Sequence, residues 1–346
     1  MHYIITLLLF IIILGIIVFV HEFGHFIWAK KFGVHIYEFS IGMGPIIKRV
    51  KGKDGIDYNI RALPIGGFVS MAGEVYEDDK KVAKKKCLCN KPVWQRVIVM
   101  AAGVINNFIL AIIVLFIASL IWGSHTMEPV IKVLDNYPMQ AAGLKDGDKI
   151  LSINNHKVNT WDEALTYLAF KNDKGYYDFK IEHEDKTIKD YRIVPVKEDV
   201  NGEERTMFGM QIHQEETNGI FNKIKYTFQK FASIISSMII TLGGLFTGRI
   251  SLNALSGPVG IYSAVGQSLS FDYLLSLLAL LSINVGVINI LPFPAFDGGR
   301  IFFLIIEKIK GSPVNQKFEN WCHIIGFILL MILIVYITIQ DIIRLF

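Results

Sequence analysis

Four long apolar runs divide the chain, and shorter mixed segments lie between them. The runs cover about residues 3–28, 97–122, 273–291 and 322–346. Each has roughly the 20 residues that a helix needs to cross the ~30 Å hydrocarbon layer of a bilayer. The first run has no Lys or Arg before it and no small-residue cleavage site after it, so we expect a retained helix and not a signal peptide. The pattern predicts a polytopic α-helical membrane protein with four transmembrane helices.

The segment between the second and third runs alternates like a small α+β domain. A strand is expected from Lys149 to Ile153, an amphipathic helix over WDEALTYLAF, and a hairpin around Glu184. The stretch AAGLKDGDKILSINN resembles the signature of a PDZ domain. This resemblance implies one PDZ-like domain at 127–214, whose groove accepts a peptide C-terminus as an added strand. A β-rich domain without a ligand is the alternative.

A shorter apolar stretch follows this domain. It runs for sixteen residues, from Phe231 to Phe246, and is interrupted by serines and glycines. The basic segment NKIKYTFQKF precedes it. We expect residues 215–272 to form an interfacial amphipathic or re-entrant segment and not a fifth crossing.

Composition and charge support the membrane assignment and give an orientation. Hydrophobic residues make up 52% of the chain and charged residues 19%, against about 25% in soluble proteins. The net charge of +4 does not indicate nucleic acid as a partner. Residues 29–96 carry 14 Lys/Arg against 7 Asp/Glu, including the cluster from Lys80 to Lys86, whereas residues 123–272 carry 16 against 19. The positive-inside rule places the first loop in the cytoplasm and the PDZ-like domain on the extracytoplasmic side.

The sequence HEFGH lies in the inner half of the first predicted helix. His21 and His25 are one helical turn apart, so their rings share a face and can reach one metal ion. Glu22 lies beside that face and can act as general base on water. A chance match, or two histidines hydrogen-bonded in a helix bundle, is the alternative. Ionisable side chains cost roughly 2.5–3.5 kcal/mol each inside a bilayer, which favours a functional site.

A third ligand is expected from the segment NILPFPAFDGGR. Pro292 and Pro294 end the third helix just before Asp297, and Gly298 and Gly299 are expected to keep the chain open after it. Unwound backbone at membrane depth is tolerated only where it lines a cavity. Asp297 is therefore the predicted third ligand, with a helix-end carboxylate at the membrane surface as the alternative. It reaches the depth of the two histidines only if residues 231–246 do not cross the membrane.

HEFGH, the PDZ-like insert and NILPFPAFDGG together resemble the site-2 proteases of family M50, in particular the bacterial regulator-of-sigma-E protease group. The resemblance implies intramembrane proteolysis with zinc (Zn²⁺) as cofactor, His21, His25 and Asp297 as its ligands, and Glu22 as catalytic base. It implies a location in the bacterial cell (inner) membrane, with the active site toward the cytoplasmic side. The implied substrates are single-span membrane proteins, such as anti-sigma factors or signal-peptide remnants.

Further motifs extend this resemblance to substrate binding. Gly42 and Gly44, in SIGMGP, match the family's G-x-G element, and the residues after them resemble its membrane-associated β-hairpin. Asn284 and Asn289 stand where the family has substrate-contacting asparagines. Amide contacts between helices are the alternative for both asparagines.

The expected organisation has four parts: residues 1–122 with two transmembrane helices and the cytoplasmic-side hairpin, 127–214 with the PDZ-like domain, 215–272 with the interfacial segment, and 273–346 with the last two helices and the Asp-Gly motif. A non-catalytic membrane PDZ scaffold with a structural metal site is the rival function. Glu22 argues against it, because a structural site needs no base. A metal transporter would require more intramembrane carboxylates than Glu22 and Asp297.

Overall fold

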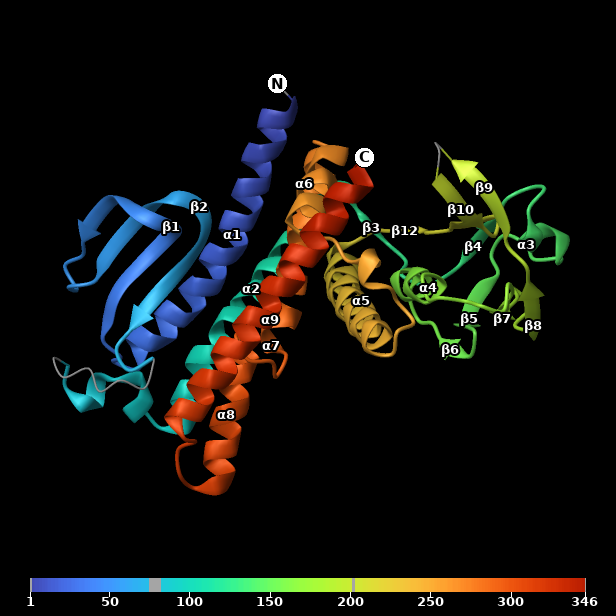
Figure 1. Ribbon diagram of the computed structural model, residues 1–346. Helices are drawn as coiled ribbons and strands as arrows, with labels where there is room; N and C mark the ends of the chain where they lie inside the picture. Colours follow the sequence, from blue (N-terminus) through green and yellow to red (C-terminus); the bar gives the residue numbers. More distant parts are fainter. Residues whose placement is uncertain (1, 75–81, 201–202, 346) are drawn as a thin grey trace. The chain divides into compact units, whose positions relative to one another are not determined.

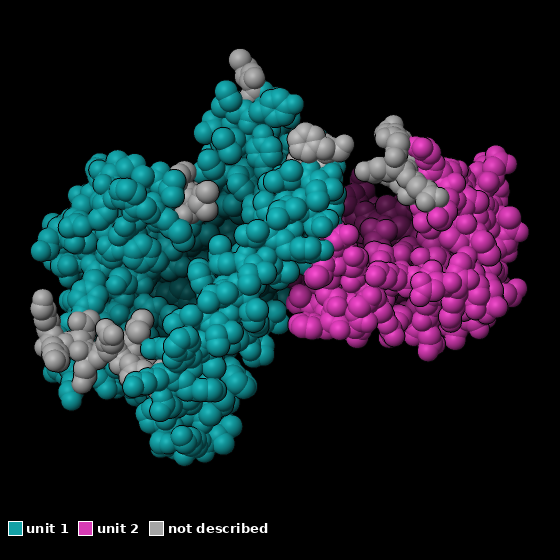
Figure 2. Space-filling model, in the orientation of Figure 1, with its two compact units in different colours: residues 1–114, 255–346 teal, residues 115–254 magenta. Residues whose placement is uncertain are grey.

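The computed structural model describes residues 2–74, 82–200 and 203–345. Part of the basic cluster predicted to set the orientation, Lys80 and Lys81, lies outside these residues. The chain forms two compact units: residues 1–114 with 255–346, and residues 115–254 (Figure 2).

The first unit contains long apolar helices that confirm the four predicted hydrophobic runs (Figure 1). Its helices are α1 (His2–Lys31), α2 (Val93–Trp122, which continues into the second unit), α6 (Pro258–Gln267), α7 (Phe271–Ile290), α8 (Asp297–Lys310) and α9 (Gln316–Leu345). Large apolar side chains along α1, α2 and α9 are exposed. Such surfaces belong in lipid, so the chain is a polytopic membrane protein.

Small residues let the helices of this unit approach closely. A Cβ atom on Gly24 of α1 would fall on the backbone of Ala102 in α2, and one on Gly286 of α7 would lie 2.5 Å from Phe108. Close backbone approach at small residues is the usual basis of helix packing in lipid.

At the far end of α9, the carboxylate of Asp341 accepts hydrogen bonds from the backbone N–H groups of Gly257 and Gly260, each at 2.8 Å.

The predicted hairpin is present as β1 (Ile36–Lys51) and β2 (Asp57–Met71), and it folds back on itself. Ser40 pairs with Phe68 on one side and with Asn59 on the other, and Asn59 also pairs with Arg49. The two strands therefore form a sheet of four segments beside α1 (Figure 1). The core between the sheet and the helices contains Phe26, Ala29, Ile36, Phe39, Val69 and Met71.

Gly42 and Gly44 lie at the bend of β1, with φ of 86° and 82°. Side chains other than glycine rarely adopt this region. A Cβ atom on Gly42 would lie 2.5 Å from the carbonyl oxygen of Leu63. In this structure the two glycines allow the hairpin to fold over.

The second unit confirms the strand, helix and hairpin expected between the second and third apolar runs. A four-stranded sheet has the order β6-β5-β7-β8, formed by β5 (Lys149–Ile153), β6 (His156–Lys157), β7 (Tyr177–Glu182) and β8 (Ile188–Ile193). Two short helices accompany it, α3 (Pro138–Ala141) and α4 (Trp161–Leu168). Among the described residues of this unit, three further strand pairs are present: β3 (Ser124–His125) with β12 (Glu216–Thr217), β4 (Ile131–Val133) with β11 (Met210–Ile212), and β9 (Val196–Val200) with β10 (Glu203–Met207).

The sixteen-residue apolar stretch from Phe231 to Phe246 is part of a longer helix, α5 (Ile220–Phe246). Among the described residues, five helices are long and apolar enough to cross a membrane, and α5 is one of them. One face of α5 is polar and packs on α4 within the second unit. Lys230 and Ser233 contact the carboxylate of Asp162, and the hydroxyl of Ser236 donates to the buried Glu163 at 2.5 Å.

Candidate metal centre

Two imidazoles of α1 define the site. His21 and His25 are 8% and 6% exposed, and their Nε2 atoms lie 3.2 Å apart. The α-helix places residues i and i+4 on the same face, which brings the two rings together. The helical spacing that predicted a shared metal is therefore present in the structure.

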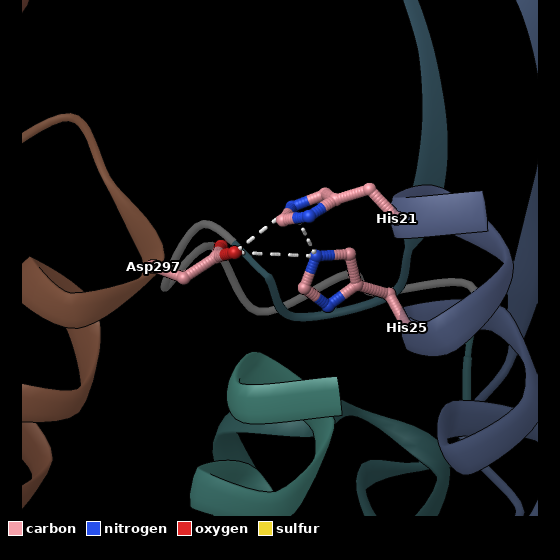
Figure 3. A group of neighbouring side chains, drawn as sticks. All are labelled: His21, His25 and Asp297. Atoms are coloured by element: carbon pink, nitrogen blue, oxygen red, sulfur yellow. Dashed lines mark hydrogen bonds and ion pairs between the residues drawn. The ribbon is translucent and has the colours of Figure 1, made fainter. Parts of the chain in front are cut away.

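Asp297 reaches the same point from a different part of the chain. Its Oδ2 atom lies 3.0 Å from Nε2 of His21 and 3.4 Å from Nε2 of His25 (Figure 3). The chain leaves α7 at Ile290 and turns through residues 291–296, and α8 begins at Asp297 itself. The predicted break before Asp297 is confirmed.

The expectation that Gly298 and Gly299 keep the chain open is wrong, because both lie in the first turn of α8. They are buried, and a Cβ atom on either would fall on a carbonyl oxygen of Ile290 or Phe293. The glycine pair lets the start of α8 pack against the end of α7. This packing holds the carboxylate of Asp297 near α1.

The three ligand atoms fit a tetrahedral metal. All lie within 4.8 Å of one another, and the three separations are 3.0, 3.2 and 3.4 Å. Ligands bound tetrahedrally at about 2.0–2.1 Å lie about 3.3 Å from each other. Oδ2 of Asp297 is buried and has no hydrogen-bond donor assigned to it. Two neutral nitrogens and one carboxylate oxygen form a donor set typical of zinc in hydrolases.

The second nitrogen of each imidazole has a partner on α2. Nδ1 of His25 donates to the carbonyl of Val99 at 2.7 Å, which leaves the lone pair of Nε2 for a metal. Nδ1 of His21 lies 3.3 Å from Nδ2 of Asn107. Oδ1 of Asn107 is buried without a hydrogen-bond partner. If the Asn107 amide is rotated by 180°, its Oδ1 accepts a hydrogen bond from the Nδ1–H of His21. Nε2 of His21 is then free to bind a metal. Gly103 of α2 also lies against the imidazoles, because a Cβ atom there would lie 2.5 Å from Nε2 of His25.

None of these α2 residues was predicted from the sequence to belong to the site. A signal for Asn107 was the presence of two adjacent amides, Asn106 and Asn107, in an apolar helix. No local pattern pointed to the carbonyl of Val99.

A cavity of about 250 Å³ opens beside the three ligands. Glu22, the predicted base, and Asn289, a predicted substrate contact, both line it. Asn284 is half-buried in α7 and does not line this cavity, and neither do Gly42 and Gly44. The end of β2 contributes other walls, namely Phe68, Val69 and Met71. At its edge Arg300 donates to Glu74 at 2.7 Å.

A pair of histidines at the H-E-x-x-H spacing, a carboxylate from a second helix and a glutamate beside the cavity define a metallopeptidase centre built in membrane helices. The family model described as Peptidase family M50 matches residues 9–333, and the chain belongs to that family. The predicted membership is thereby confirmed, and with it the peptidase class of the chain.

Named relatives agree with this assignment. The chain is 32% identical to the zinc metalloprotease RasP of Bacillus licheniformis and 32% identical to the regulator of sigma-W protease RasP of Bacillus subtilis. Each alignment extends over 421 residues and covers 99% of both proteins. A Fusobacterium nucleatum protein is 36% identical over 346 residues, again with 99% of both proteins covered. Since the chain has 346 residues, the Bacillus relatives contain segments that it lacks.

Proposed function

We propose that this protein is an intramembrane zinc metalloprotease that cleaves transmembrane segments of single-span membrane proteins in regulated proteolysis. The observation that supports it most is the convergence of His21, His25 and Asp297 within 4.8 Å, from two helices far apart in sequence. Family membership and the regulatory name of the Bacillus subtilis relative support the same function. Anti-sigma factors or signal-peptide remnants are the proposed substrates.

In the proposed mechanism His21, His25 and Asp297 hold the metal. Zinc, when bound, supplies a Lewis acid that polarises the scissile carbonyl and lowers the pKa of water toward about 7. Glu22 accepts the proton of the attacking water and delivers it to the nitrogen of the leaving amine. The hydrogen bond from His25 to Val99 keeps that imidazole in the tautomer that binds metal.

The substrate must lose its helical hydrogen bonds before its peptide bonds can be attacked, and a free sheet edge can replace them. We propose the end of β2, residues 67–71, as this edge, because three of its side chains line the cavity. The amide of Asn289 lines the same cavity and offers both a donor and an acceptor to exposed backbone. Gly42 and Gly44 act from farther away, by allowing the hairpin to fold over. Asn284 is a proposed substrate contact outside this cavity.

The proposed topology has four crossings, with the active site toward the cytoplasm of a bacterial cell. Residues 127–214 form the extracytoplasmic PDZ-like domain, which selects substrates by size or by an exposed peptide C-terminus. Helix α5 then lies at the interface, and its polar contacts with Asp162 and Glu163 of the second unit support that placement. Because these contacts cover the serine and lysine face of α5, the face left to meet lipid is mainly apolar.

The substitution Glu22→Gln tests the proposed function. It removes the base and leaves all three ligands in place. The variant should bind zinc as the parent does and still bind a model single-span substrate, but cleavage should fall by at least about a hundredfold. Undiminished cleavage would refute the mechanism. A parent protein that binds zinc but cleaves no membrane-spanning substrate would instead favour the non-catalytic scaffold.

A further inference from the structure

The turn that delivers Asp297 has an unusual residue at its third position. Phe296 N donates to the carbonyl of Phe293 at 3.2 Å, Pro294 occupies the second position, and Ala295 has φ of 87°. These are the features of a type II β-turn, whose third position is normally glycine. An alanine in this left-handed region is strained, so the turn needs support from outside.

That support comes from α9, through the peptide bond between Pro294 and Ala295. Nδ1 of His323 accepts a hydrogen bond from the N–H of Ala295 at 3.1 Å. On the same face of α9, one turn later, Gly326 is buried against the carbonyl side of that peptide. A Cβ atom on Gly326 would lie 2.5 Å from the carbonyl oxygen of Pro294.

Both contacts therefore act on the peptide unit that distinguishes the two common turn types. Type I and type II turns differ mainly by a flip of this central peptide. A flip would withdraw the Ala295 N–H from His323 and drive the Pro294 oxygen away from Gly326. The flip would also change the direction in which the chain enters Asp297, two residues later.

We propose that His323 and Gly326 form a clamp on the Pro294–Ala295 peptide that positions Asp297 for metal binding. Both are positioning residues, since neither touches a ligand atom. This inference rests on the proposed zinc site. It adds a role for the last helix, whose described residues contribute no ligand to that site.

The test measures zinc affinity of the full-length, detergent-solubilised protein by chelator competition, which requires no substrate. His323→Leu and Gly326→Ala should each raise the zinc dissociation constant about tenfold, as loss of a supporting partner commonly does. His323→Asn should retain affinity, because its amide oxygen can accept the same N–H. Gly15→Ala is the matched control, since it adds a methyl group to another membrane helix at a site with nothing within 4 Å.

A second substitution separates the clamp from a general loss of packing. Ala295→Gly removes the strain at the third turn position and should restore part of the affinity in either variant. If His323→Leu does not fold, the comparison of Gly326→Ala with and without Ala295→Gly decides the question. Parent-like zinc affinity in a clamp variant, or an equal loss in Gly15→Ala, would overturn the clamp alone. A parent protein that binds no zinc would overturn the proposed metal site as well.

Discussion

At the scale of single residues, the glycine that faces the proposed metal site is Gly103. Gly103 faces both imidazoles, and its missing side chain leaves the space beside their Nε2 atoms. In a helix interior, replacing glycine by alanine usually stabilises by about 1 kcal/mol. At this position the added methyl group would occupy the space that the ligand atoms need.

We therefore expect Gly103→Ala to lower zinc affinity by at least tenfold, because the imidazoles must shift away from α2. The cost of such overpacking is typically about 1–3 kcal/mol. Zinc content after dialysis against a fixed free zinc concentration measures it. Gly15→Ala, which meets no neighbour, should keep the parent content. Equal zinc content in both variants would show that Gly103 does not limit the site.

At the scale of an element, the number of membrane crossings depends on whether α5 crosses the bilayer or lies at its surface. Its 27 residues are long enough to cross a bilayer, yet its polar face is held by Asp162 and Glu163 of the second unit. Length and composition alone do not distinguish a crossing helix from one at the interface. The hydrogen bonds favour the interface.

Labelling of single cysteines with a membrane-impermeant maleimide tests this placement. Phe221 and Phe246 lie near the two ends of α5 and are 84% and 87% exposed. In a background with the three native cysteines changed to serine, Phe221→Cys and Phe246→Cys should both be labelled from the side that labels His213→Cys. Lys53→Cys in the hairpin should be labelled from the opposite side. Labelling of Phe246→Cys together with Lys53→Cys would mean that α5 crosses.

At the scale of the whole molecule, the three proposed metal ligands lie in only one of the two compact units. These proposed ligands come from α1 and α8, and both helices belong to the first unit. A ligand that binds only the folded state stabilises it, by about 2.7 kcal/mol at a free concentration 100 times the dissociation constant.

Zinc removal should consequently lower the melting temperature of the first unit and leave that of the second unchanged. Differential scanning calorimetry in detergent, with and without a chelator, can follow both transitions. The variant with His21→Ala and His25→Ala should show no shift on chelation. A shift confined to the second unit, or one that persists in this variant, would contradict the assignment of the ligands.

Features that depend on short-range order could be predicted from the amino-acid sequence alone. The apolar runs, the i, i+4 spacing of His21 and His25, and the break at Pro292 and Pro294 follow from the geometry of one helix or one turn. The candidate ligand Asp297 could be named because carboxylates are costly in lipid and few are present.

Features that depend on contacts between distant segments could be seen only in the folded protein. The opposing positions of Gly103 and the imidazoles, the support of Ala295 by His323, and the burial of Gly298 against the end of α7 join residues far apart in sequence or across a turn. The same holds for the polar contacts between α5 and α4, which join segments far apart in sequence. Periodicity reports which face of an element is apolar, but it does not report which partner that face meets.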